Sequence, residues 1–370
     1  LVNLYRQPIC IAQTRHRAAL VVECLNGIGP MACGFNASAG RKKTNHQFAS
    51  SLKYLFLNEK ATRPRLPSKA NQRGISMRAI CLGGGPAGLY FAISLKLRQP
   101  EADVTVLERN RPDDTFGWGV VLSDETLDNL EANDPVSAKE IRSHFAYWDD
   151  IALHHKGNTI LSSGHGFCGI GRKRLLLILQ ERARELGVNL QFETEVKDAS
   201  EYMDDYDLVV ASDGLNSKTR MEFEETFKPD IDVRRCPFVW LGTHQKFDNA
   251  FTFIFENTDK GWIWVHAYQF DKDTATFIVE CSQETFDAYG FGEKTQEETI
   301  AICEEIFKDH LDGHKLMTNA SHIRGSAWIK FPRVLCEKWS HENVVLLGDA
   351  SATAHFSIGS GTKLALESAI

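Results

Sequence analysis

The sequence has no C-x-x-C pair and no long uninterrupted apolar run, and each absence excludes a class of protein. Its nine cysteines are scattered and odd in number, so the sequence predicts neither a disulfide framework nor a zinc site. The apolar stretch AALVVECL is too short and too interrupted by charge to cross a bilayer, and no other stretch comes closer. We therefore expect a cytoplasmic protein in a reducing setting, with no metal and no membrane partner.

The first 76 residues differ in composition from the rest of the chain. They carry twelve Lys or Arg against two Asp or Glu, a net charge of +10, which leaves −17 for the remainder of a chain whose net charge is −7. They lack an initiator Met and any sustained periodicity, so we expect residues 1–76 to be an irregular basic leader outside the fold, which would begin at Met77. A targeting peptide or a contact with nucleic acid would also suit the basic runs, but extraneous translation is the simpler interpretation, and we expect no nucleic-acid partner. The chain stops at Ile370 inside an apparent helix, so we expect a truncated C-terminus.

The stretch AICLGGGPAGLYFAISLKL places a glycine-rich turn between two apolar runs. The run Ala79–Leu82 predicts a strand, and Leu89–Leu97 has the spacing of a helix. Between them, Gly83, Gly85 and Gly88 fit the G-x-G-x-x-G pattern, which allows a tight turn, close approach of backbone to a pyrophosphate, and packing of the helix on the strand. The free N–H groups at the start of the helix favour phosphate. The pattern is weak by itself, because glycine-rich turns also occur where nothing binds.

A second predicted strand adds a carboxylate at the spacing that a dinucleotide site requires. The strand is Val104–Leu107, and Glu108 at its end follows Gly88 by about 20 residues, where a carboxylate can bind a ribose hydroxyl. An exposed glutamate at a strand end is the alternative, but the joint spacing favours the dinucleotide site.

Two further predicted strands end in aspartates. Leu208–Ala211 leads to Asp213-Gly214 in a D-G-x-x-S-x-x-R run, and Val344–Leu347 leads to Gly348-Asp349. A second glycine-rich loop, Gly359–Gly361, then enters a helix. An Asp-Gly pair alone is most often a turn. Three such strand ends in one chain indicate a shared nucleotide site.

The order of these motifs resembles that of the FAD-dependent aromatic hydroxylases, the class A flavoprotein monooxygenases, over residues 77–370. The resemblance implies an α/β fold in which a Rossmann-type FAD-binding domain, assembled from distant segments, carries an antiparallel β-sheet substrate domain inserted at about 230–335. It implies FAD as the cofactor and NAD(P)H as the electron donor, without a second dinucleotide motif. The reaction it implies is attack of an electron-rich aromatic ring on a flavin C4a-hydroperoxide formed with dioxygen.

The resemblance also implies roles for the residues that match the motifs of this family. Asp349 would bind the ribityl chain, Asp213 would support the pyrophosphate, and Arg172 would open a long helix and reach the cofactor. A solvated cation at the helix start is the alternative for Arg172, and Arg174 could take its place. The segment FGWGVVLSDETLDNL would lie against the isoalloxazine, and a helix start near Thr362 would face the pyrimidine edge of the reduced flavin. The expected cofactor contacts are Gly83, Gly85, Pro86, Ala87, Gly88, Glu108, Arg109, Gly119, Val120, Arg172, Asp213, Gly348, Asp349, Gly359, Gly361 and Thr362.

Four stretches resemble one branch of this family, the anthraniloyl-CoA monooxygenases and salicylyl-CoA 5-hydroxylases. They are RNRPDDTFGWGVVLSD, GHGFCGIGRKRLL, FKPDIDVRRCPFVWLGTH and AHFSIGSGTKLALE. The branch implies an aromatic acyl-CoA substrate hydroxylated at ring position 5. Two alternatives stay open: a FAD monooxygenase like the tryptophan hydroxylase of violacein synthesis, and a FAD reductase or cyclase of the same fold that does not activate dioxygen.

Alternating aromatic residues between the D-G and G-D motifs predict the strands of the substrate sheet. The run GWIWVHAYQF places Trp262, Trp264, His266 and Tyr268 on one face. We expect His266 or His355 to be catalytic, by accepting the proton of a hydroxyl or amino group on the substrate. The alternative for His266 is a core histidine bonded to a backbone carbonyl.

Overall fold

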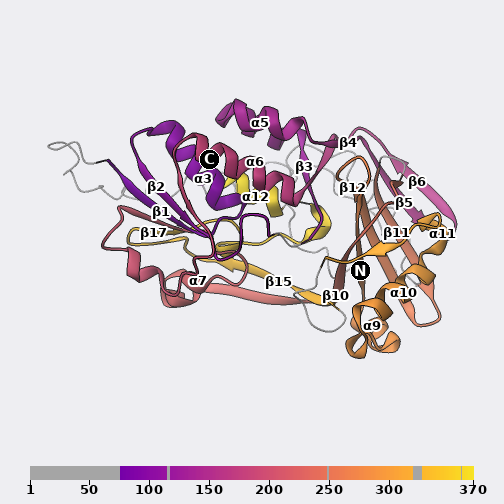
Figure 1. Ribbon diagram of the computed structural model, residues 1–370. Coiled ribbons are helices and arrows are strands. Elements are labelled where there is room, and N and C mark those ends of the chain that lie inside the picture. The colour runs from indigo at the N-terminus through magenta and orange to yellow at the C-terminus, as the bar shows by residue number, and fades with distance from the viewer. Residues whose placement is uncertain (1–75, 115–116, 248–249, 320–326, 360) are drawn as a thin grey trace, which may run out of the picture. The chain divides into compact units, whose positions relative to one another are not determined.

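The computed structural model describes residues 76–114, 117–247, 250–319, 327–359 and 361–370. The leader predicted over 1–76 lies outside the described residues except for Ser76. The unit Ser76–Ile370 contains three β-sheets with helices around them (Figure 1).

The first sheet has six strands in the order β16-β17-β9-β1-β2-β8. All neighbours are parallel except β16 and β17. Its strands are β1 (Arg78–Leu82), β2 (Asp103–Leu107), β8 (Asn189–Gln191), β9 (Leu208–Ala211), β16 (Ser340–His341) and β17 (Val344–Leu346). The central strands are continuous apolar runs because both faces of this sheet are covered.

Helices pack on both faces of the six-stranded sheet. On β1, Ala79 and Cys81 face one apolar core, and Ile80 and Leu82 face the other. The first core contains side chains from α3 (Pro86–Arg98), α4 (Asp124–Asn133), α5 (Pro135–Arg142), α6 (Arg172–Glu185) and α12 (Gly361–Glu367). The second core lies under η1 (Ala199–Tyr202), α7 (Lys218–Glu222) and α8 (Glu224–Phe227). This arrangement confirms the predicted α/β fold with a Rossmann-type part.

The second sheet has eight strands in the order β14-β10-β13-β12-β11-β5-β6, with β15 paired to β10. Its strands are β5 (Asp150–His155), β6 (Asn158–Ser162), β10 (Pro229–Thr243), β11 (Ala250–Thr258), β12 (Gly261–Gln269), β13 (Ala275–Cys281), β14 (Leu316–Met317) and β15 (Ile329–Cys336). Most of them come from the segment predicted to be the inserted substrate sheet, but the hairpin β5–β6 precedes that segment and joins β11 in parallel. The extent of the substrate domain as a unit stays a prediction.

The two faces of the eight-stranded sheet have different neighbours. One face is covered by α9 (Gln283–Tyr289), η3 (Phe291–Glu293), α10 (Gln296–Ile306) and α11 (Lys308–Leu311). The alternate residues of β12, among them Tyr268, face away from that core. Tyr268 packs against a small third sheet in the order β3-β7-β4, made of β3 (Gly119–Ser123), β7 (Phe167–Gly171) and β4 (Ala146–Trp148).

One long strand runs between the two larger sheets. The first part of β10 pairs with β15 and its last part pairs with β13, with a shift of register between Val233 and Pro237 (Figure 1). A bulge at this point bends the strand. The strand therefore links the Rossmann-type part to the aromatic face of the second sheet.

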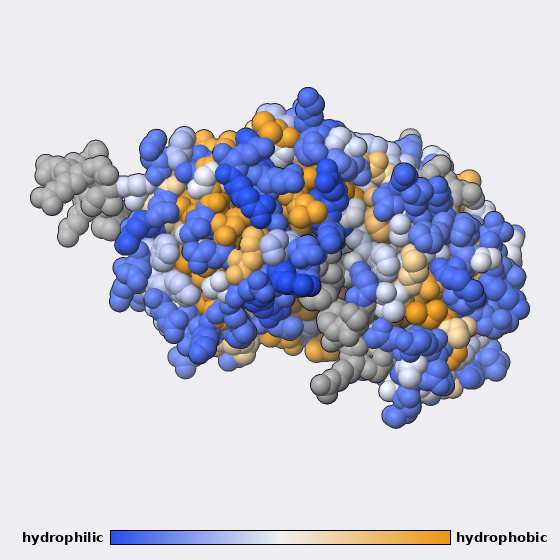
Figure 2. All heavy atoms as spheres, in the orientation of Figure 1, coloured by the Kyte–Doolittle hydropathy of each residue, from blue (hydrophilic) through white to orange (hydrophobic). Residues whose placement is uncertain are grey.

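Among the described residues, no helix has both the length and the apolar character needed to cross a membrane. The face of the molecule in Figure 2 is mostly hydrophilic, with apolar side chains scattered over α5 and α12. Val136 and Leu364 are the exposed apolar residues of these two helices. All six cysteines in the described part of the chain are free thiols.

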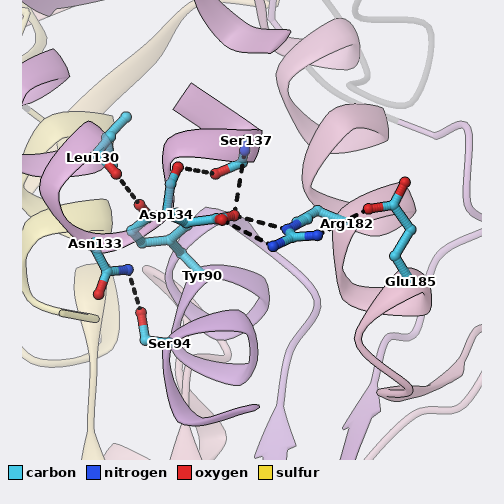
Figure 3. A network of polar contacts seen from close by, with 8 residues as sticks. All are labelled: Tyr90, Ser94, Leu130, Asn133, Asp134, Ser137, Arg182 and Glu185. Carbon is cyan, nitrogen blue, oxygen red and sulfur yellow. Dashed lines mark hydrogen bonds and ion pairs between the residues drawn. The ribbon is translucent and has the colours of Figure 1, made fainter. Parts of the chain in front are cut away.

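A buried ion pair joins three helices of the Rossmann-type part (Figure 3). Asp134 lies between α4 and α5, is 1% exposed, and accepts two hydrogen bonds from Arg182 of α6, at 2.9 and 3.0 Å. The same carboxylate caps α5 by accepting from the N–H of Ser137. Arg182 also pairs with Glu185, whose side chain is 61% exposed.

Asp134→Asn is expected to lower the free energy of unfolding by about 3 kcal/mol, because it leaves the Arg182 guanidinium without its buried counter-charge. Glu185→Gln removes the other carboxylate on the same arginine and is the matched control. It is expected to cost less than about 1 kcal/mol, because solvent screens that pair. Chemical denaturation followed by circular dichroism measures both. Equal losses in the two variants would contradict the role given to Asp134.

Candidate active site

Neighbouring parallel strands bring the three strand-end motifs to one edge of the six-stranded sheet. Strand β1 lies between β2 and β9, and β9 pairs with β17. Gly83 follows β1, Asp213 follows β9 and Asp349 follows β17. Because parallel strands end at the same edge, these residues lie side by side although they are far apart in the sequence.

The three glycines of the first loop differ in what a larger side chain would contact at each position. Gly83 has a φ of +114°, and a Cβ on it would lie 2.3 Å from the Ser212 carbonyl oxygen. A Cβ on Gly88 would lie 2.2 Å from the Gly83 carbonyl oxygen, so this glycine lets α3 pack against the loop. A Cβ on Gly85 would meet no heavy atom of the described chain within 4 Å. The open side of the loop is therefore at Gly85, the position expected to face a pyrophosphate.

The helix start after this loop is also packed against the G-D motif. Helix α3 begins with Pro86 and Ala87, and proline suits the first turn because its missing N–H would have no helical partner. A Cβ on Gly348 would lie 2.9 Å from the Ala87 Cβ atom. Gly348, with a φ of +62°, thus allows the G-D loop to approach α3 closely.

Glu108 lies where the ribose contact was predicted, but in this structure its carboxylate binds the protein. One oxygen accepts from the Gly84 N–H at 2.8 Å. The other accepts from the backbone N–H and the side-chain amide of Asn110, at 2.9 and 2.7 Å. Arg109 beside it is exposed. The ribose contact of Glu108 stays a prediction.

Arg220 ties the D-G motif to the G-D motif. Its side chain is buried and donates to the carbonyl oxygens of Leu215 at 2.6 Å, Ala350 at 3.1 Å and Asp349 at 3.5 Å. Burial lowers the pKa of this guanidinium. The sequence pattern contained Arg220, but its role in joining two loops needed the structure.

Asp213 has one oxygen engaged and one open. Its Oδ2 accepts from the N–H and the hydroxyl of Thr219, both at 3.1 Å. Its Oδ1 is buried without a hydrogen-bond partner in the described part of the protein. A buried carboxylate oxygen of this kind requires a donor, which a bound ligand or water would supply.

Arg172 and Asp349 interact electrostatically across the edge of the six-stranded sheet. Arg172 is the first residue of α6, as predicted, and its Nε has no partner among the described residues. Solvent still reaches both residues. Surrounding protein atoms nevertheless lower the pKa of Arg172 and raise that of Asp349, while their mutual attraction opposes both shifts. Arg174 binds Glu140 and His144 instead, so Arg172 is the arginine that interacts with the G-D aspartate.

The segment predicted to lie against the isoalloxazine meets both the last glycine loop and the second sheet. Gly119 accepts at its carbonyl oxygen from the Tyr268 hydroxyl at 2.9 Å. Val120 is buried, and a Cβ on Gly359 would lie 3.1 Å from Cβ of the adjacent Val121. Helix α12, which contacts β3, begins at Gly361 and includes Thr362.

These features fit a flavin dinucleotide. The open side at Gly85 suits a pyrophosphate. Arg172 Nε and Asp213 Oδ1 have no hydrogen-bond partner among the described residues, so these polar atoms are suited to bind a cofactor. The donors and acceptors lie at the sheet edge where α/β folds bind nucleotides.

Comparisons with known proteins decide the family. The model of the FAD binding domain family matches residues 76–370. The chain belongs to this family. It is 42% identical over 302 residues to a salicyloyl-CoA 5-hydroxylase of Streptomyces sp., a match that covers 80% of this chain and 57% of that relative. It is 34% identical over 294 residues to protodeoxyviolaceinate monooxygenase of Chromobacterium violaceum, covering 78% and 77% of the two chains.

A solved structure shares the fold of this FAD-binding chain. The 2-methyl-3-hydroxypyridine-5-carboxylic acid oxygenase matches with a TM-score of 0.64 at 20% identity, covering 79% of this chain and 80% of that one. The family predicted from the order of the three motifs is thereby confirmed. The chain spans 57% of the length of the salicyloyl-CoA 5-hydroxylase.

A buried carboxylate on β13, the strand next to β12, binds the aromatic residues of β12, and the sequence analysis did not single it out. Glu280 of β13 lies directly opposite Trp264 and is 5% exposed. Its Oε2 accepts from the Trp264 indole N–H at 2.9 Å and lies 3.4 Å from His266 Nε2. Its Oε1 lies 3.9 Å from His355 Nε2. The signal in the sequence was a glutamate inside the apolar strand TFIVEC, since a buried carboxylate needs partners.

The two histidines predicted to be catalytic therefore meet at one glutamate. His266 is 5% exposed and contacts the rings of Phe253 and Phe356. His355 is half-buried, and burial lowers its pKa against the opposing effect of Glu280. The predicted alternative of a backbone carbonyl partner for His266 does not describe the contact that the structure has, which is with a carboxylate.

Gly85→Ala is expected to leave the stability of the apoprotein unchanged, because Gly85 has an ordinary extended conformation with φ −75° and room for a methyl group. The methyl group would stand between the backbone and a pyrophosphate, so FAD binding should weaken about tenfold or more. Fluorescence titration of the apoprotein with FAD measures this.

Two further glycine variants serve as controls for Gly85→Ala. Gly83→Ala should destabilise the fold itself by about 2 kcal/mol or more, because of the positive φ and the clash with Ser212. Gly292→Ala, whose Cβ would lie at an ordinary 3.5 Å from Phe286, should change neither property. FAD affinity in Gly85→Ala equal to that of Gly292→Ala would contradict the placement of the pyrophosphate.

Proposed function

We propose that this chain is a FAD- and NAD(P)H-dependent monooxygenase that hydroxylates an aromatic CoA thioester, salicylyl-CoA or anthraniloyl-CoA, at ring position 5. The observation that carries the proposal is the 42% identity to a salicyloyl-CoA 5-hydroxylase, which covers 80% of this chain. The substrates are the aromatic acyl-CoA and dioxygen. Bound FAD would supply the activation of dioxygen by electrons from NAD(P)H.

Different residues at the edge of the six-stranded sheet would bind different parts of the cofactor. The loop around Gly85 and the start of α3 would take the pyrophosphate, with Asp213 beside it. Asp349 would bind the ribityl hydroxyls, and Arg172 would donate to the cofactor through the nitrogen that lacks a partner in the described chain. Glu108 would bind the adenosine ribose through the lone pairs that its protein contacts leave open.

The aromatic face of β12 and β11 would bind the ring of the substrate. Phe251 and Phe253 pack edge-to-face beside Tyr268 and His266, and the surroundings are apolar. A pocket of this kind excludes water and holds a ring carbon near the reacting oxygen. An ortho hydroxyl or amino group supplies electron density to the carbon opposite it, which is ring position 5.

Two other functions fit parts of the same structure. The 34% identity to protodeoxyviolaceinate monooxygenase favours, as the second candidate, a monooxygenase acting on an indole-type ring without a thioester, such as tryptophan. A FAD reductase or cyclase would use the same cofactor edge without oxygen transfer. The free thiols among the described residues support a reducing setting, which we propose is the cytoplasm.

A substrate panel tests the proposal directly. The FAD-loaded protein is incubated with NADH or NADPH and with salicylyl-CoA, anthraniloyl-CoA, benzoyl-CoA or tryptophan. Salicylyl-CoA or anthraniloyl-CoA should stimulate NAD(P)H oxidation and yield a hydroxylated thioester, detected by mass spectrometry. Benzoyl-CoA should not be hydroxylated, because it lacks the ortho group that donates electrons.

The outcome of the panel separates the three functions. Hydroxylation of tryptophan alone would establish the second candidate. NAD(P)H oxidation with no hydroxylated product from any compound would indicate the reductase. Free salicylate is the matched control for the thioester, and equal turnover of salicylate and salicylyl-CoA would remove CoA from the proposal.

A further inference from the structure

Glu280 is a buried carboxylate with an unambiguous hydrogen-bond donor. The Trp264 indole N–H can only donate, and it fixes Oε2 of Glu280 at 2.9 Å. Both side chains belong to paired residues of adjacent strands, so the carboxylate is held by the rigid sheet. A carboxylate in this position orients any imidazole that shares it.

The tautomer of His355 follows from its other neighbour. The backbone N–H of Ser357 donates to His355 Nδ1 at 3.3 Å, and the Ser357 hydroxyl, 2.8 Å from the same nitrogen, can donate to it as well, so Nδ1 acts as an acceptor. Because burial lowers the pKa of His355, the ring is neutral near pH 7, and its single proton is on Nε2, the atom that faces Glu280. The lone pair of His355 is thus already occupied, and this histidine is not available as a base.

The tautomer of His266 is set by Glu280. Its Nε2 lies 3.4 Å from Oε2 of the carboxylate, and its Nδ1 is buried with no partner among the described residues. A proton on Nδ1 would leave a buried N–H unpaired and place the Nε2 lone pair against a carboxylate, and both are unfavourable. The proton is therefore on Nε2, and Nδ1 carries a free lone pair directed away from Glu280.

The free Nδ1 lies in the region that joins the substrate face to the cofactor edge. Tyr268, two residues further along β12 and so about 7 Å away, donates to Gly119 in the segment expected to contact the flavin. Phe356, which contacts the His266 ring, belongs to the loop between Asp349 and Gly359. His266 thus lies between the proposed substrate-binding face and the loop that is expected to contact the flavin.

We propose that His266 is the catalytic base for the ring hydroxyl of the substrate and that Glu280 is a positioning residue that holds its tautomer. This inference rests on the proposed function. The O–H bond of the phenol breaks, the proton joins His266 Nδ1, and the electron pair stays on the phenolate oxygen, where it enriches the ring carbon opposite. The imidazolium that forms is stabilised by the Glu280 carboxylate.

Other titratable groups surround this pair and bear on its pH dependence. On β10, Arg234 pairs with Asp232 at 2.8 Å, and burial raises the pKa of the Cys236 thiol to about 11, so the thiol is neutral near pH 7. Lys330 of β15 and Glu284 of α9 influence Cys236 from further away. His355, whose Nε2 lies 3.9 Å from Oε1 of Glu280, is a further titratable neighbour among the described residues.

The test compares ionisation and hydroxylation of salicylyl-CoA in His266→Gln, Glu280→Gln and His355→Gln. The absorbance of the bound phenolate, measured on oxidised enzyme without NAD(P)H, should appear at lower pH in the wild type than for free salicylyl-CoA. This lowering should vanish in His266→Gln and Glu280→Gln and persist in His355→Gln. Product formed per NAD(P)H consumed should fall about tenfold or more near pH 7 in the first two variants and recover as the pH rises and solvent ionises the phenol.

A second histidine–glutamate pair, between helix α11 and strand β11 of the same sheet, provides the matched control. His310 Nε2 lies 2.9 Å from Glu256 of β11, with both side chains partly exposed, so Glu256→Gln removes an equivalent charge elsewhere. It should keep the wild-type pH profile. An unchanged pH profile in His266→Gln or Glu280→Gln, with active wild type, would overturn this inference alone. A wild type that hydroxylates anthraniloyl-CoA but not salicylyl-CoA would overturn this inference alone, and one that hydroxylates neither would overturn the proposed function as well.

Discussion

The guanidinium of Arg220 is the contact on which the cofactor edge depends. It is buried between the loops after β9 and β17, and it donates to carbonyl oxygens on both. Its two terminal nitrogens have acceptors on these loops, whereas its Nε has no partner among the described residues, so the buried charge is stabilised only while the two loops keep their spacing. The positions of Asp213 and Asp349, which follow these strands, are thereby fixed together before any ligand binds.

Rigidity on the substrate side has a different origin. Glu280 and Trp264 are opposed residues of adjacent antiparallel strands, and Tyr268 is anchored on Gly119 of the third sheet. The first contact fixes the carboxylate beside His266, the proposed base, and the second connects the sheet to the segment expected to contact the flavin. Together they make the geometry of the pocket a property of paired strands, which are more precise supports than loops.

The sequence predicted the elements whose signals are local. The glycine turn, Glu108 at its strand end and Arg172 at the start of α6 all follow from spacing within a short stretch. Contacts between distant segments gave no such signal. Nothing near Asp134 indicates Arg182, and nothing near His355 indicates Glu280, because pairs of this kind depend on how helices and strands pack. The same holds for the hairpin β5–β6, whose place beside β11 is set by tertiary pairing.

That hairpin has a consequence for how the chain is made. Ile151 of β5 pairs with Phe251 of β11, which is synthesised 100 residues later. At ribosomal speeds of 5–20 residues per second, the hairpin waits roughly 5 to 20 seconds for its partner strand. Throughout that interval the edge of β5 lacks its partner strand, and an unpaired edge is prone to pair with other chains until β11 emerges.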